Sequence, residues 1–129
     1  MHKNEVLIRD HVAKLSMGDV HGALDDYAED AVLHYPGRNA LSGTHRGRDE
    51  IAAFLGQAMS LTGGTFRPEV HDALANDDHA IMLVACRAER DGKVFEWLAT
   101  DVYHADGHRI SEHWIFENDQ DSVDQLFHV

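Results

Sequence analysis

The chain lacks cysteine pairs, an excess of basic charge and long apolar runs. Its 129 residues include one cysteine, Cys86, so no internal disulfide can form, and we expect a cytoplasmic protein. The 11 Lys and Arg residues against 23 Asp and Glu give a formal net charge of −12, which repels nucleic-acid phosphates and anionic lipids. No stretch approaches the roughly 20 apolar residues of a membrane span. We therefore expect neither nucleic-acid nor membrane partners.

The length fits a single domain. A chain of 129 residues can bury a hydrophobic core without disulfides or metals, so we expect one domain over residues 1–129. Residues 118–129 begin with acidic side chains and offer few apolar ones. This tail is expected to form either a short last helical turn or a mobile end.

Helical spacing of apolar residues marks three N-terminal segments. Residues 4–17 repeat apolar side chains at this spacing, and Gly18 supplies a stop. A second helix is expected to start after the N-cap Asp19 and to bury Tyr27 on its apolar face. A third is expected over residues 49–62.

Alternating β-branched and aromatic residues predict strands in the remaining chain. A short strand is expected over residues 31–35, followed by a polar loop over residues 36–47. Residues 65–74 contain Pro68 and fit an edge strand or a bulged strand. A longer strand is expected over residues 79–89.

Two Asp-Gly turns set the expected registers of the long strands. The turn at Asp91-Gly92 pairs Met82 with Asp101. Because side chains alternate along a strand, every second residue of these two strands shares the face of Met82 and Asp101, and these residues add an apolar lining.

The second turn, Asp106-Gly107, is expected to pair Asp101 with Glu112. A slip by one residue would put Asp101 opposite His113 and scatter the aromatic side chains, so patterning favours the first register. Beside the two acids, this face then carries Met82, Trp97, Ala99, Tyr103, Trp114 and Phe116.

The facing acids are the main functional signal. Two carboxylates on an apolar surface resist each other's ionisation, so one of Asp101 and Glu112 is expected to hold its proton above the usual carboxylic pKa. Such a group suits general acid work or hydrogen-bond donation to an oxyanion. In the alternative, Glu112 reaches past the sheet edge to solvent and Asp101 bonds a neighbouring hydroxyl.

Several histidines are candidates for a site. His11 borders the buried stripe of the first helix, as a packing residue or a functional one. His34 and Tyr35 point to opposite faces of their strand, so only one can easily look inward. A metal site from His104, His108, His113 and Glu112 is not expected, because the hairpin scatters these side chains.

The outer face of the sheet also carries apolar residues. Ile81, Leu83, Leu98 and Ile115 are expected there, and they are too apolar to be left in water. A two-fold partner is the simplest cover, so the sequence predicts a homodimer through this face.

The order of these elements and motifs resembles the NTF2-like superfamily of α+β cones and, within it, the SnoaL-like proteins. The resemblance spans nearly the whole chain, and order and spacing carry it more than any single motif. Its segments are Gly18-Asp19 and residues 27–32, 34–37, 41–43, 45–47, 75–78 and 106–114. The resemblance implies an NTF2-like cone in which three N-terminal helices pack on a strongly curved, mainly antiparallel (mixed) β-sheet.

The resemblance also bears on the reaction. Compared with ketosteroid isomerases, Asp101 falls where that family keeps a protonated, oxyanion-binding aspartate, and His11 falls at the position of its tyrosine donor. Tyr35 stands where the family places its aspartate base, and a phenol is a poor base at neutral pH, so the usual steroid isomerisation is not expected. SnoaL-type cyclases combine an acid/base aspartate with a histidine-rich pocket and need no metal or organic cofactor.

The sequence thus predicts a cofactor-independent acid/base enzyme of isomerase, cyclase or dehydratase type, acting on a hydrophobic, oxygen-bearing small molecule. Asp101 is its acid/base group or oxyanion donor, Glu112 the coupled carboxylate, and His34 and His11 polar partners. The expected substrate-binding residues are Tyr27, Tyr35, Met82, Trp97, Ala99, Tyr103, Trp114 and Phe116. The alternative is a non-catalytic small-molecule-binding or dimerisation module of the same fold.

Overall fold

The computed structural model describes residues 1–129 as four helices and six strands. In chain order these are α1 (Lys3–Ser16), α2 (Val20–Asp25), β1 (Tyr27–Tyr35), β2 (Gly43–Arg46), α3 (Gly47–Leu61), β3 (Arg67–Ala75), β4 (His79–Arg90), β5 (Lys93–Ala105), β6 (Ile110–Glu117) and α4 (Gln120–Leu126). The strands form one sheet in the order β2-β1-β6-β5-β4-β3. Strands β1 and β6 are parallel, and every other neighbouring pair is antiparallel.

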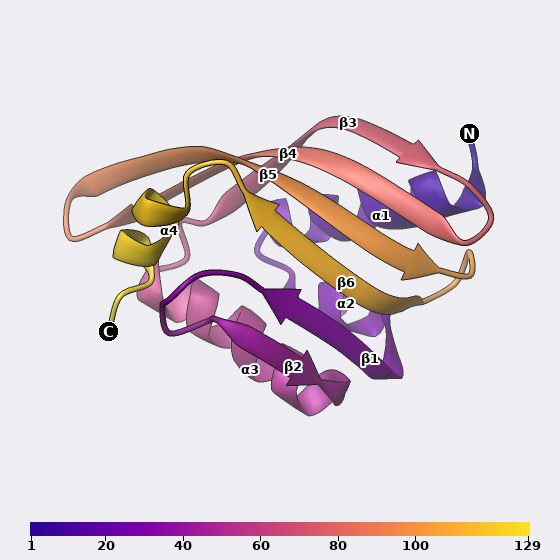
Figure 1. The fold of residues 1–129 in the computed structure, drawn as a ribbon, viewed down its shortest axis with the longest axis horizontal. Coiled ribbons are helices and arrows are strands. Elements are labelled where there is room, and N and C mark those ends of the chain that lie inside the picture. Colours follow the sequence, from indigo (N-terminus) through magenta and orange to yellow (C-terminus); the bar gives the residue numbers. More distant parts are fainter.

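The sheet curves, and helices α1, α2 and α3 lie along one side of it (Figure 1). The short helix α4 lies near the end of the sheet where the β4–β5 hairpin turns, far from the N-terminus (Figure 1). This arrangement confirms the predicted α+β class, with three N-terminal helices on a curved, mixed sheet. The fourth helix, α4, lies in the C-terminal tail.

Helices α1, α2 and α4 begin where a side chain accepts a hydrogen bond from a free N–H group. The imidazole of His2 accepts a hydrogen bond from the Asn4 N–H at 3.0 Å, at the start of α1. Asp19 accepts one from the Gly22 N–H at 2.9 Å and caps α2, as the sequence predicts. None of the four helices combines the length and the apolar character needed to cross a bilayer.

Two strands differ from the sequence prediction. Strand β1 begins at Tyr27, which apolar periodicity assigned to the second helix, because the Ile110 N–H bonds the Asp26 carbonyl at 2.8 Å and starts a parallel pairing with β6. Strand β2, Gly43–Arg46, forms within the predicted polar loop over residues 36–47 because it pairs with the end of β1. In both cases tertiary pairing overrides local composition.

The prediction for residues 65–74 is confirmed. Strand β3 is an edge strand and carries Pro68, and a bulge interrupts its pairing with β4. An edge position suits proline, which has no N–H to donate to a ladder.

The C-terminal tail forms a helix, the first of the two alternatives for residues 118–129. Asp119 caps α4 by accepting a hydrogen bond from the Ser122 N–H at 3.2 Å. Helix α4 places Val123 and Leu126, both 0% exposed, against the core, and Phe127 follows at 1%. These buried contacts hold the tail on the sheet.

The predicted register of the β4–β5 hairpin is confirmed. Met82 faces Asp101, and Arg87 faces Glu96 on the other side of the sheet. Asp91 and Gly92 form the two-residue turn with φ of 53° and 78°, as a type I′ hairpin turn requires.

The predicted register of the β5–β6 hairpin is wrong. Ala105 pairs with Ile110 and His104 pairs with Glu112, so Ser111 is an extra residue that forms a bulge. Because side chains alternate along a strand, the new register turns each later side chain of β6 to the opposite face from the one predicted.

The loop and helix α1 together fix this register. The Asp106 carboxylate accepts hydrogen bonds from the His108 and Arg109 N–H groups, both at 2.9 Å, and so widens the turn to four residues. The buried side chain of Asn4 accepts a hydrogen bond from the Gly107 N–H at 2.7 Å and donates one to the Ala105 carbonyl at 3.1 Å.

Candidate active site

A cavity of about 80 Å³ lies between the inner face of the sheet and the helices, mainly α3. This is several times the ~10–15 Å³ that holds one water but about half the ~150 Å³ of a cavity that binds benzene, so an aromatic ligand enters only when wall side chains move. Its wall is hydrophobic except for three side chains with a carboxyl or imidazole group, Asp101, His113 and Glu117. A mainly hydrophobic lining with a few polar groups is typical of a small-molecule site.

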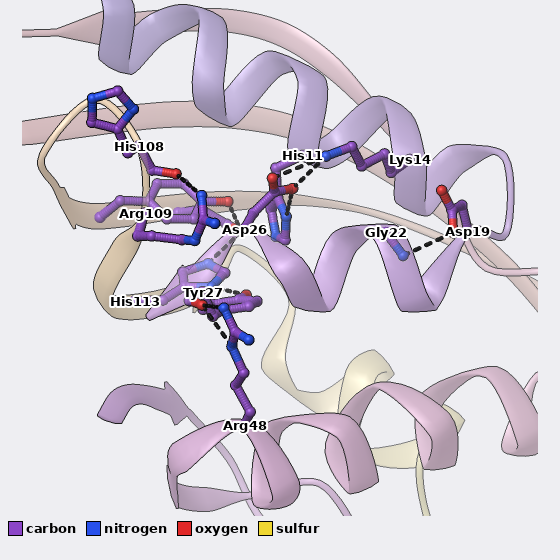
Figure 2. Close-up of polar contacts among 12 residues, drawn as sticks. His11, Lys14, Asp19, Gly22, Asp26, Tyr27, Arg48, His108, Arg109 and His113 are labelled. Atoms are coloured by element: carbon purple, nitrogen blue, oxygen red, sulfur yellow. Dashed lines mark hydrogen bonds and ion pairs between the residues drawn. The ribbon is translucent and has the colours of Figure 1, made fainter. Parts of the chain in front are cut away.

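Strands β1, β5 and β6 build a hydrogen-bonded chain across this cavity. The Tyr27 hydroxyl lies 2.9 Å from His113 Nδ1, and His113 Nε2 lies 2.9 Å from Asp101 Oδ2. The Tyr103 hydroxyl donates to the same Asp101 oxygen at 3.2 Å. The rings of Tyr103 and His113 stack with centroids 4.1 Å apart, since these residues are cross-strand partners. Figure 2 shows Tyr27 and His113 side by side.

The protonation states along the chain follow from burial. Burial lowers the pKa of His113 below its ordinary value, more than the neighbouring Asp101 carboxylate raises it. Burial, with the charge of Asp101, also holds the pKa values of Tyr27 and Tyr103 well above 10. Neutral His113 therefore donates from Nε2 to Asp101 and accepts at Nδ1 from the Tyr27 hydroxyl.

This pattern leaves one oxygen of Asp101 available. Both hydrogen bonds to Asp101 fall on Oδ2, and Oδ1 has no partner within the protein. The carboxylate is thus oriented by two donors and presents a free oxygen in a mainly apolar cavity.

Glu117 is the second acid of the cavity. It pairs with Ala99 across β5 and β6, so it is a diagonal neighbour of Asp101 on the same face. Burial raises the pKa of Glu117 to about 7, and the negative charge of Asp101 adds to the rise. The polar groups of Tyr35 and Trp97 lie close enough to Glu117 to offset part of this rise in its pKa. The cavity therefore holds two acids that oppose each other's ionisation, but the partner of Asp101 is Glu117 and not the predicted Glu112.

The predicted site residues on β5 and β1 that face inward line the cavity. The cavity wall includes Asp101, Tyr27, Tyr35, Trp97, Ala99 and Tyr103. Met82 lies on the predicted face but is fully buried in the core, away from the cavity wall.

The predictions for Glu112, Trp114, Phe116 and His34 are wrong, because all four lie outside the cavity. The bulge turns Glu112 outward, where its Oε2 lies 2.7 Å from Nε2 of His34. Trp114 stacks on the His34 ring at 5.4 Å, and Phe116 is 54% exposed. The partly exposed His34–Glu112 pair is a surface contact of the outer sheet face.

His11 is buried behind the cavity and does not line it. Its Nδ1 lies 3.0 Å from Asp26 Oδ2, and Lys14 Nζ donates to Asp26 Oδ1 at 2.9 Å (Figure 2). Burial alone would raise the pKa of Asp26, but the hydrogen bonds and charges of His11 and Lys14 lower it below its ordinary value. The His11 ring meets the Tyr27 ring edge-on at 5.1 Å, so His11 supports the position of Tyr27.

The structure separates the histidines of the β5–β6 hairpin. His113 points into the cavity, whereas His104 Nδ1 lies 3.9 Å from Glu112 Oε1 near the outer face. No three His, Cys, Asp or Glu side chains converge on one point.

A curved mixed sheet, three helices on its inner side and an apolar cavity with acids define an NTF2-like protein. The SnoaL-like domain family matches residues 8–113, and the chain belongs to this family.

Relatives support this assignment. An uncharacterized protein of Mycobacterium tuberculosis (strain ATCC 25618 / H37Rv) is 32% identical over 106 residues, which are 81% of each chain. The structure of Bal32a, from a soil-derived mobile gene cassette, is similar with a TM-score of 0.90 and 28% identity over 97% of this chain and 96% of that one. A Xanthomonas campestris protein of unknown function with a cystatin-like fold matches over 100% of both chains with a TM-score of 0.90 and 24% identity, and shows the fold alone.

Proposed function

We propose that the protein is a cofactor-independent acid–base enzyme that moves a proton on a hydrophobic, oxygen-bearing small molecule in the cavity. The observation that carries this proposal is the Asp101 carboxylate, held by two donors on Oδ2 with Oδ1 free. The SnoaL-like family supports an isomerase or cyclase type of reaction.

The geometry suits removal of a proton from a carbon beside a carbonyl group. Asp101 takes the proton, the electron pair of the C–H bond forms a C=C bond, and the carbonyl oxygen becomes an oxyanion or an enol. The neutral His113 and the two tyrosines hold the base in place without competing for the substrate proton. When the substrate also carries a C=C bond next to the carbon that loses the proton, return of the proton to the far carbon of that bond moves the double bond and completes an isomerisation.

Glu117 provides the complementary acid. Its pKa of about 7 leaves a large protonated fraction near neutral pH, while Asp101 serves as the base. Two acids in different environments can divide the acid and base roles of one reaction in this way.

Exchange of carbon-bound protons for deuterium tests the proposal without knowledge of the natural substrate. Small planar ketones such as acetophenone, incubated with the protein in D₂O, are expected to lose α-proton signal in NMR spectra faster than in buffer alone. If no ketone, enone or lactone of a panel exchanges faster with the protein, the enzymatic proposal fails. Binding without exchange would then favour a non-catalytic binding module.

We propose further that the protein is a homodimer through the outer sheet face. Ile81, Leu83 and Leu98 lie there with 39%, 41% and 56% exposure. Phe116 joins this face in the observed register, and Ile115 leaves it to line the cavity, which corrects the sequence prediction. Leu83, Leu98 and Phe116 border one shallow hollow, so these apolar residues form a continuous surface.

Leu83→Arg is expected to convert the dimer to a monomer, because it places a charge in the centre of this apolar surface. Light scattering should give about twice 14.5 kDa for the wild type and about 14.5 kDa for the variant. Val6→Arg on α1 is the matched control, since Val6 is also 41% exposed but lies on a helix. Equal masses for the wild type and Leu83→Arg would reject this interface.

A further inference from the structure

Two polar atoms in the cavity have no hydrogen-bond partner. Trp97 Nε1 and Glu117 Oε2 are both buried and unpaired, and Trp97 as a whole is 5% exposed. Trp97 and Glu117 both flank Ala99 on the inner face, Trp97 two residues along β5 and Glu117 across the strands. A buried polar group without a partner lowers stability unless a ligand or water pairs with it.

The chemistry of these two atoms restricts what can pair with them. An indole N–H can only donate, so its partner must be an acceptor. A protonated carboxyl can donate as well, and a carbonyl oxygen has two lone pairs that accept both hydrogen bonds. Trp97 lies close enough to Glu117 to affect its pKa, but the two atoms do not meet the geometry of a hydrogen bond, so one acceptor near both can take a hydrogen bond from each.

We infer that the cavity binds a small planar carbonyl compound whose oxygen lies between Trp97 Nε1 and Glu117 Oε2. The wall favours an apolar ligand body because it is mainly hydrophobic, and it includes Phe66, whose ring stacks on Trp97 with a 26° angle between the rings. The inference names the ligand class of the proposed function and rests on the same cavity. In this arrangement Trp97 and Glu117 bind the carbonyl oxygen, and Asp101 faces the carbon that loses its proton.

The ionisation of Glu117 decides whether this binding occurs. The titratable groups that face Glu117 are Asp101 on β5, Tyr35 on β1, Cys86 on β4 and His113 on its own strand. Helix α3 presents only apolar side chains to the cavity. Burial and the Asp101 charge place the pKa of Glu117 at about 7, so its donor is lost at mildly alkaline pH.

An NMR titration with acetophenone and its matched alcohol, 1-phenylethanol, tests the inference. The two tryptophan indole N–H signals report on opposite faces of the sheet, Trp97 inside and Trp114 outside. Acetophenone is expected to move the Trp97 signal downfield and to leave that of Trp114 in place. Its affinity should fall about tenfold between pH 6 and pH 8, following the protonated fraction of Glu117. The alcohol can donate to the ionised carboxylate and should not show this loss.

Two variants separate the donors. Trp97→Phe should weaken acetophenone binding on the order of tenfold, the effect of one lost hydrogen bond. Glu117→Gln keeps a donor at every pH, so it should retain binding and abolish the pH dependence. Identical pH profiles for ketone and alcohol, or an unmoved Trp97 signal, would overturn the inference.

The test of ketone binding and the test of the proposed reaction can fail independently. At mildly acidic pH, where Glu117 stays protonated after the Asp101 charge is removed, Asp101→Asn should strongly slow carbon-proton exchange but keep the acetophenone-induced shift of Trp97. A shift without exchange in the wild type leaves the binding site standing and rejects the reaction. Exchange without a shift of the Trp97 signal supports the reaction and rejects the binding site between Trp97 and Glu117.

Discussion

Asp101→Asn is expected to slow carbon-proton exchange by about 10²–10⁴-fold, the usual contribution of a positioned general base. The amide keeps the size of the side chain, and its oxygen can still accept from His113 and Tyr103. It cannot take a proton at neutral pH, so the fold and the binding of the ketone should survive while the reaction is lost. Exchange rates by NMR at a fixed ketone concentration measure the effect.

Glu112→Gln is the matched control for this variant. The sequence places Glu112 opposite Asp101, but in the structure it pairs with His34 outside the cavity. The exchange rate of Glu112→Gln should therefore equal that of the wild type. A large loss in this variant, or an unchanged rate in Asp101→Asn, would show that the site is elsewhere.

Glu117→Gln is expected to stabilise the protein at pH 8 by on the order of 2–3 kcal/mol and to leave its stability at pH 4.5 nearly unchanged. The folded state raises the pKa of this carboxyl from 4.5 to about 7, so it binds the proton more tightly than the unfolded state does. The stability that protonation supplies is complete below pH 4.5 and is lost as the pH rises to 7. Above that pH the wild type buries a charge and the variant does not.

Urea unfolding at pH 4.5 and pH 8 measures this difference, and the melting temperature at pH 8 should rise by roughly 5–10 °C. At pH 8 the same variant should bind the ketone more tightly than the wild type, since glutamine still donates there and the ionised carboxylate does not. A variant that is less stable than the wild type at pH 8 would mean that Glu117 is solvated or paired when ionised.

The β4–β5 register could be predicted because its turn is local. Asp91 and Gly92 adopt positive φ values, and a two-residue turn of this type permits a single register. Every pair counted back from it follows, including Met82 with Asp101. Asp101 therefore lies on the inner face of the sheet, as the sequence predicts.

The β5–β6 register could not be predicted from the same dipeptide. Asp106 uses its side chain to accept from two later N–H groups, and Asn4, about a hundred residues away in the chain, binds the turn. The sequence signal was present in Asp106, but the contact with Asn4 exists only in the folded protein. The bulge at Ser111 follows from both and exchanges Glu112 for His113 and Glu117 in the cavity.

The start of β1 shows the same limit. Tyr27 continues the apolar spacing of α2, so local periodicity assigns it to the helix. In the structure its hydroxyl bonds His113 and its backbone carbonyl accepts from the Arg48 guanidinium at 2.7 Å (Figure 2). Contacts with β6 and α3 decide the conformation, and neither is adjacent in sequence.

Direct titration of the Glu117 carboxyl by ¹³C NMR tests most plainly whether β6 presents this acid to the cavity beside Asp101. A midpoint near pH 7 is expected, because burial and the Asp101 charge both oppose ionisation. A midpoint near 4.5, the ordinary pKa of a glutamate, would place Glu117 in solvent and contradict the register, the site and the proposed chemistry together.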